Sequence, residues 1–407
     1  MIPEKRVEFQ VLLGAVSIVT NKSPSKVHNE RWIVQLARCD FPRLLDLAVA
    51  HGLVAWLDEA LRLSMICHNN NYLVELSGFM RDTLRVTQFQ SIQQSKIAIK
   101  ISNLFTSAGI DHVVFKGLGA LNQFYSGFVQ SRVSDDLDLL VRPESLPGAV
   151  SELLKHGYKL SDGENALTIA NFVRWYSSLY RWRDLGFINT NSLNHKVDLH
   201  WRISDRFTYP VDVNHLIESR TVEETAYGSL PCVNFSEHFV YVCVHGYSDF
   251  FFRLRHLVDV YAATKQPLFD IEKVMLISKQ NGVEKVVQDS IQLAGAFFDG
   301  QPLEEIGCTS EYVSRVSEHF ALSNGWPKRT HPNTGVWRGR DRYQHLQKQI
   351  KHRSRNCFWF SPLISRALMG PQDIACWSGT GWGVFSVFLK SYFRRLTMGL
   401  GFKKKTR

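Results

Sequence analysis

The feature that most constrains the fold is a pair of carboxylates at the start of a hydrophobic strand. Asp136 and Asp138 flank Leu137, and the apolar run at 139–141 follows before Pro143 ends the strand. Residues i and i+2 of a strand point to the same face, so both carboxylates lie on one side. The apolar residues after them indicate a buried strand. The pair predicts either a metal-binding site or a solvated acidic strand end beside a turn.

Other residues near this strand favour the metal-binding interpretation. An earlier strand-forming run leads directly into Lys116 and Gly117, and a glycine there lets the backbone approach a phosphate group closely. Lys116 and Arg132 supply cationic groups for phosphate. Asp198, in a later apolar strand, is the third carboxylate that such a site needs. Because Mg²⁺ prefers hard oxygen ligands, Mg²⁺ or Mn²⁺ is the expected cofactor.

The surrounding sequence alternates between helical and strand patterns. The first 107 residues have apolar positions at helical spacing, and Gly52 marks a break between two helices. Strands are expected at 112–115, 137–141 and 196–201. A strand followed by a helix at 145–156 is typical of an α/β unit. Further helices are expected at 236–247, 254–263 and 271–298.

The motifs resemble a poorly characterised nucleotidyltransferase family, a branch of the polymerase beta-type nucleotidyltransferase superfamily. Three segments carry the resemblance, at 113–117, 132–143 and 197–201, and it extends from about residue 30 to residue 300. It implies an α+β fold, with a nucleotidyltransferase-like mixed β-sheet core and helices flanked by helical regions. We therefore expect four regions: an N-terminal helical region (1–107), the nucleotidyltransferase-like α/β core (108–205), a second helical region (206–325) and a basic aromatic C-terminal tail (326–407).

The same resemblance implies roles for individual residues in a two-metal transfer of a nucleoside monophosphate from a nucleoside triphosphate. Asp136 and Asp138 would bind both metals. Asp198 would complete one metal site and help to activate the acceptor hydroxyl. Lys116 would contact phosphate, and its motif departs from the superfamily pattern because Leu118, rather than a second Gly or a Ser, follows the glycine.

His200 follows Asp198 by two residues and has three interpretations. It orients Asp198, it lines the nucleotide pocket, or it packs with Trp201 at the end of the strand. We place it with Lys116, Gly117 and Arg132 among the residues expected to bind the nucleotide.

The net charge of +10 suits a polyanionic partner, which includes a nucleoside triphosphate, nucleic acid and an anionic membrane surface. Much of the excess lies after Arg338, away from the predicted site, so nucleic acid ranks below the triphosphate. Basic and aromatic residues in the tail predict either a peripheral membrane contact or packing of the tail on the protein itself. Seven dispersed cysteines and the absence of a signal-peptide pattern predict a cytoplasmic protein, with membrane contact through the tail as a further expectation.

The sequence leaves two leading functions open, and a nucleic-acid-binding factor driven by the positive net charge ranks third. The first is a metal-dependent nucleotidyltransferase that acts on an unidentified hydroxyl or phosphate acceptor, which the resemblance associates with surface polysaccharide biosynthesis. The second is a non-catalytic protein that uses the same fold to bind a nucleotide or a partner. The position of Asp198 distinguishes them, because an active site requires it within roughly 6–7 Å of Asp136 and Asp138.

Overall fold

The computed structural model describes residues 7–21, 26–68, 71–125, 134, 136–161, 165–177, 182–189, 195–204, 209, 211–299 and isolated positions between 312 and 389. The chain forms two compact units, each assembled from segments that are distant in the sequence. The first, which we call the helical unit, takes Met1–Lys96, Lys116–Ser134 and Asn234–Lys351. The second, which we call the sheet unit, takes Ile97–Phe115, Asp135–Val233 and His352–Arg407.

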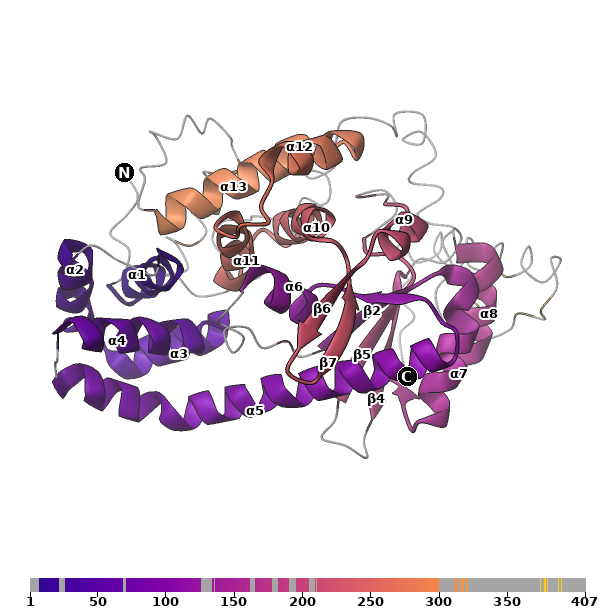
Figure 1. Ribbon diagram of the computed structural model, residues 1–407, viewed down its shortest axis with the longest axis horizontal. Coiled ribbons are helices and arrows are strands. Elements are labelled where there is room, and N and C mark those ends of the chain that lie inside the picture. Colours follow the sequence, from indigo (N-terminus) through magenta and orange to yellow (C-terminus); the bar gives the residue numbers. More distant parts are fainter. Residues whose placement is uncertain are drawn as a thin grey trace, which may run out of the picture. The chain divides into compact units, whose positions relative to one another are not determined.

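The helical unit combines helices from both halves of the chain (Figure 1). The predicted helices before residue 107 and after residue 235 are confirmed. A short helix, α6, supplies the middle segment. The elements are α1 (Val7–Asn21), α2 (Lys26–Leu36), α3 (Phe41–His51), α4 (Val54–His68), α6 (Gly117–Phe124), α10 (Phe235–Ser248), α11 (Leu254–Thr264), α12 (Ile271–Gln280) and α13 (Glu284–Phe298). The long helix α5 (Asn71–Ser107) supplies residues to both units.

Local capping sets the limits of α3 and confirms the predicted break at Gly52. The Asp40 side chain accepts a hydrogen bond from the backbone N–H of Arg43 at the start of the helix. Gly52 ends the helix with a φ of 70°, and its N–H bonds to the carbonyls of Ala48 and Val49. Glycine adopts this left-handed conformation without the steric cost that a side chain would add.

The sheet unit is built on a seven-stranded mixed sheet with the order β3-β4-β5-β2-β1-β7-β6. The predicted α+β fold is therefore confirmed. Parallel pairs join β2 to β5 and β1 to β7, and the other neighbours are antiparallel. The strands are β1 (His112–Val114), β2 (Asp136–Val141), β3 (Lys159–Leu160), β4 (Asp184–Asn189), β5 (His195–His200), β6 (Thr221–Thr225) and β7 (Gly228–Cys232). The remaining elements of this unit are η1 (Pro143–Ser145), α7 (Leu146–Lys155), α8 (Ala166–Tyr176) and α9 (Val213–Glu218).

The predicted strand with two carboxylates lies in the interior of this sheet. β2 runs between β5 and β1, and its apolar residues from Leu139 to Val141 are fully buried. The antiparallel register pairs His112 with Val141 and Val114 with Leu139. Consequently the residue before β1, Asp111, and the residue after β2, Arg142, meet at one end of the strand pair, while Asp136 and Asp138 lie toward the other.

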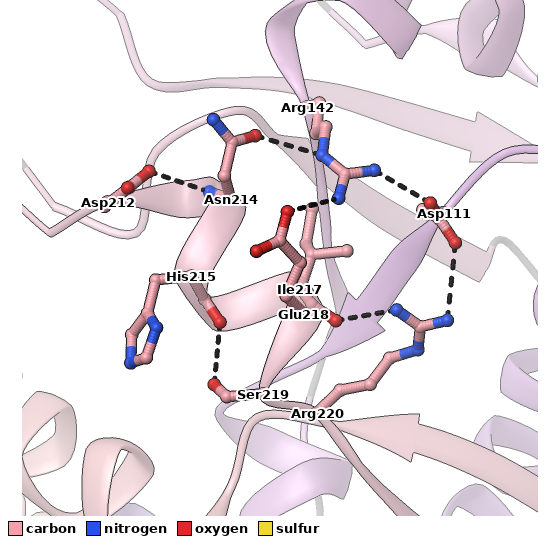
Figure 2. Close-up of polar contacts among 9 residues, drawn as sticks. All are labelled: Asp111, Arg142, Asp212, Asn214, His215, Ile217, Glu218, Ser219 and Arg220. Carbon is pink, nitrogen blue, oxygen red and sulfur yellow. Dashed lines mark hydrogen bonds and ion pairs between the residues drawn. The ribbon is translucent and has the colours of Figure 1, made fainter.

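An ion-pair network closes the Asp111 end (Figure 2). Arg142 donates to Asp111 at 2.8 Å and to the Asn214 side chain at 3.0 Å, and it lies 3.4 Å from a Glu218 carboxylate oxygen. Arg220 contacts the other Asp111 oxygen at 3.3 Å. The hydrogen bond from Arg142, with the nearby charge of Arg220, lowers the pKa of Asp111. This end of the sheet is therefore stabilised by alternating charges.

Among the described residues, none of the helices combines the length and the apolar character that crossing a bilayer requires. The predicted basic tail lies outside the described residues except for a few isolated positions.

Candidate metal centre

The parallel pairing of β2 with β5 brings two of the predicted carboxylates together. Asp138 is the register partner of Asp198, and Asp136 is the register partner of Lys196. Directly paired residues of neighbouring strands project their side chains to the same face of a sheet. Asp138 and Asp198 therefore stand side by side although 60 positions separate them in the sequence.

His200 joins these two aspartates in a compact group of metal-ligand types. One ligand atom from each of Asp138, Asp198 and His200 lies within 4.8 Å of the other two. Nε2 of His200 is 2.9 Å from Oδ1 of Asp138. Asp138 is 4% exposed and His200 is 0% exposed, whereas Asp198 is half-buried. The group thus has a buried side at His200 and a more accessible side at Asp198.

Neighbouring strands fix the His200 ring. Asp184 is its register partner on β4, and Oδ2 of Asp184 lies 3.7 Å from Nδ1. The Phe115 ring packs edge-on against the imidazole at a centroid distance of 4.9 Å. Because an ionised carboxylate can only accept, the contact with Asp138 is a hydrogen bond that Nε2–H donates. The imidazole therefore orients the Asp138 carboxylate.

A glycine leaves room beside the second aspartate. Gly186 on β4 is the register partner of Asp198. A Cβ at this position would lie 3.2 Å from Oγ of Ser161 and 3.4 Å from Oδ1 of Asp198. A larger side chain would project into the space next to the Asp198 carboxylate. The absence of a side chain at Gly186 therefore avoids a close contact with the Asp198 carboxylate from this position.

The remaining predicted carboxylate and arginine have different positions. Asp136 is the first residue of β2, is half-buried, and lies on the same face as Asp138 one pleat earlier. The close group of three contains His200 together with Asp138 and Asp198. Arg132 lies outside the described residues.

Lys116 and Gly117 belong to the helical unit, where Lys116 precedes α6 and Gly117 is its first residue. The positive φ falls on Lys116, whose φ is 54° and ψ is −146°, and not on the glycine. Such a conformation costs a non-glycine residue about 1–3 kcal/mol. The Lys116 N–H donates to Nε2 of His238 at 3.0 Å, and the Lys116 carbonyl accepts from Ala120 at 2.6 Å. Backbone strain is therefore held at the position predicted to bind phosphate.

The Asp138 and Asp198 carboxylates fit a divalent cation, with His200 holding Asp138 in place. Ligand bonds of about 2.1 Å place neighbouring ligand atoms roughly 3–4 Å apart, which the observed spacing approaches. Carboxylate oxygens suit Mg²⁺ and Mn²⁺. Sequence reasoning identified the two aspartates and His200, but Asp184 and Gly186 gave no signal because their importance depends on strand register.

Comparison with known proteins agrees with this geometry. A sequence-family profile described as "Uncharacterised nucleotidyltransferase" matches residues 38–299, which is more than half of the chain and includes every residue of the candidate site. No curated protein matches the chain.

Proposed function

The chain belongs to the uncharacterised nucleotidyltransferase family, and from this premise we propose that it transfers a nucleoside monophosphate from a nucleoside triphosphate to a hydroxyl or phosphate acceptor in a metal-dependent reaction. The observation that supports the proposal most strongly is the pairing of Asp138 with Asp198 next to His200. Two carboxylates side by side repel each other, and a bound cation would reduce that repulsion. A site for Mg²⁺ or Mn²⁺ is therefore consistent with their pairing.

In this proposal the chain's own residues bind and orient. Asp138 and Asp198 hold the cation, and His200 keeps the Asp138 carboxylate in position through its 2.9 Å hydrogen bond. Asp136, one pleat earlier on the same face, is the proposed further carboxylate of the site. A divalent cation, when bound, neutralises charge on the triphosphate oxygens.

Asp198 is the proposed proton acceptor. It is the more accessible of the two aspartates, and Gly186 leaves space beside its carboxylate. The acceptor oxygen forms a bond to the α-phosphorus, the bond to the bridging oxygen breaks, and pyrophosphate leaves. The proton of an acceptor hydroxyl passes to the Asp198 carboxylate. Positioning and charge stabilisation supply most of the rate in reactions of this class.

The remaining assignments are parts of the same proposal. Lys116 and Gly117 bind phosphate, with Arg132 as a second cation. The acceptor belongs to surface polysaccharide biosynthesis, the protein works in the cytoplasm, and the basic tail contacts an anionic membrane surface. The family resemblance motivates the phosphate-binding residues and the acceptor, the cysteine pattern motivates the cytoplasmic location, and the charge distribution motivates the membrane contact.

A transfer assay tests the proposal. The protein is incubated with each α-labelled nucleoside triphosphate, Mg²⁺ or Mn²⁺, and a cell extract as the source of acceptor. We expect the wild type to transfer label and both Asp136→Ala and Asp138→Ala to lose the transfer. Absence of transfer, together with nucleotide binding that does not depend on metal, would favour the non-catalytic alternative.

A further inference from the structure

His238 makes two directional hydrogen bonds inside the helical unit. It lies on α10 and is 0% exposed. Its Nε2 lies 3.0 Å from the backbone nitrogen of Lys116, and its Nδ1 lies 2.9 Å from Oε1 of Gln123. One buried side chain therefore contacts both the residue before α6 and the last turn of α6.

The first of these contacts fixes the protonation state of the imidazole. A backbone N–H can only donate, so Nε2 of His238 must be the unprotonated acceptor. A neutral imidazole then carries its proton on Nδ1, which donates to the Gln123 side-chain oxygen. The two contacts are consistent with a single tautomer. His238 is thus prepared to accept the Lys116 N–H.

The Lys116 N–H belongs to the strained residue that precedes α6. With a φ of 54° and a ψ of −146°, Lys116 occupies a region that side-chain-bearing residues avoid. Such conformations persist only where the surroundings hold them, and they concentrate at functional sites. Here the N–H of the residue is bound by His238, and its carbonyl is bound by Ala120 in the first turn of α6. The peptide groups on both sides of the strained residue are fixed.

We propose that His238 is a positioning residue for triphosphate binding, which holds the Lys116 backbone in the strained conformation from which Lys116 and Gly117 bind phosphate. The proposal rests on the nucleotidyltransferase function proposed above and adds a residue that does not itself touch the substrate. The histidine lies 122 positions from Lys116 in the sequence, which explains why a local motif does not include it.

The chain offers a matched control in His51. This histidine is also 0% exposed, belongs to the same unit, and accepts a backbone N–H through Nδ1, from Leu254 at 3.1 Å. Leu254 begins α11, as Lys116 precedes α6. Replacing either histidine by leucine removes an acceptor from a buried N–H next to a helix start. Of the two histidines, His238 is the one that binds the Lys116 N–H.

The experiment measures the dissociation constant of each of ATP, GTP, CTP and UTP with Mg²⁺ by calorimetry, together with the melting temperature. We expect His238→Leu to weaken triphosphate binding about tenfold, as when an orienting partner of a binding group is removed. His51→Leu should lower the melting temperature comparably and change the dissociation constant less than about twofold, since it leaves the Lys116 segment intact. His238→Gln, which retains an acceptor for the Lys116 N–H, should recover most of the affinity. If His238→Leu does not fold, Gln123→Leu provides a milder loss in the same direction.

Equal losses of affinity in His238→Leu and His51→Leu, or unchanged affinity in His238→Leu, would overturn the positioning role. A wild type that binds triphosphate but transfers nothing would contradict the proposed enzyme activity. The dissociation constants of the wild type and the histidine variants would then still test the positioning role of His238. A wild type that binds none of the four triphosphates would overturn both proposals.

Discussion

The two ends of the β1–β2 strand pair carry carboxylates in opposite arrangements. At one end Asp111 lies between Arg142 and Arg220, so that charges of opposite sign alternate (Figure 2). At the other end Asp138 and Asp198 stand side by side. Alternating charges lower the free energy of the folded protein, while adjacent like charges raise it, and a bound cation would offset that cost. The first end is therefore built for stability, and the second is suited to ligand binding at some cost in stability.

Both ends belong to the sheet unit, so substitutions at one end serve as controls for the other. If the contrast is correct, substitutions at the Asp138 end lower transfer activity without lowering stability. Substitutions at the Asp111 end lower stability without lowering transfer activity.

The largest expected effect comes from Asp138→Asn. Loss of one charged ligand should lower the rate of transfer by about 10³-fold, which corresponds to several kcal/mol of transition-state stabilisation. Because the substitution also removes repulsion with Asp198, the melting temperature should stay constant or rise. Initial rates and thermal unfolding measure the two quantities. Asp111→Asn is the control and should lower the melting temperature without affecting transfer. Parallel losses of activity in the two variants would contradict the contrast.

A smaller effect is expected at His200. His200→Leu removes the donor that orients Asp138 and should weaken Mn²⁺ binding about 10–100-fold. His200→Gln retains a side-chain N–H donor, so it should restore part of the affinity if His200 acts through its hydrogen bond. Titration followed by electron paramagnetic resonance measures free Mn²⁺ directly. Equal affinity in wild type and His200→Leu would show that the hydrogen bond to Asp138 is not needed.

Arg142→Met should have its effect on stability alone. It removes the contacts with Asp111, Asn214 and Glu218, which are partly exposed, so the free energy of unfolding should fall by about 1 kcal/mol. Chemical denaturation measures this change, and high salt should reduce the difference between wild type and variant. A loss of transfer activity larger than about threefold would mean that this end also serves catalysis, contrary to the contrast.

The smallest expected effect is a pH dependence from His112, which lies next to Asp111. Burial lowers its pKa, and its ring accepts from Ser102 at Nε2 and donates to the Ile110 carbonyl at Nδ1. The unfolded chain, with a histidine pKa of about 6.5, then binds more protons than the folded chain below that pH. Stability should therefore decline as the pH falls below about 6.5, and His112→Gln should remove this part of the decline. Unfolding curves for both proteins between pH 5 and pH 8 measure the difference, and identical slopes would contradict it.

Strong periodicity explains which elements were predictable. β2 and the helices α10 to α13 carry apolar residues at the spacing of their structure, and the sequence predicts all of them. β4 was not predicted, because Gly186 interrupts it and polar residues stand at both its ends. β6 was not predicted either, because its residues are largely exposed and show no apolar period. Its place at the edge of the sheet follows from its hairpin with β7 and from the pairing of β7 with β1, and the second of these contacts joins residues far apart in the sequence.

The candidate site, like the fold, was predictable from the sequence only in part. Asp138 and Asp198 were predictable because each stands in an apolar strand and the family resemblance joins them. The contact of His200 with Asp138 and the space left by Gly186 depend on strand register, which a single sequence does not specify. The strain at Lys116 gave no signal, because the residue that adopts a positive φ is a lysine beside a glycine.

Anomalous diffraction from crystals grown with Mn²⁺ and a nucleoside triphosphate tests the central claim most directly. The account predicts an anomalous peak about 2.2 Å from carboxylate oxygens of both Asp138 and Asp198, and loss of that peak in Asp138→Asn crystals. A peak that avoids both carboxylates, or no peak in crystals whose protein has bound the triphosphate, would contradict it.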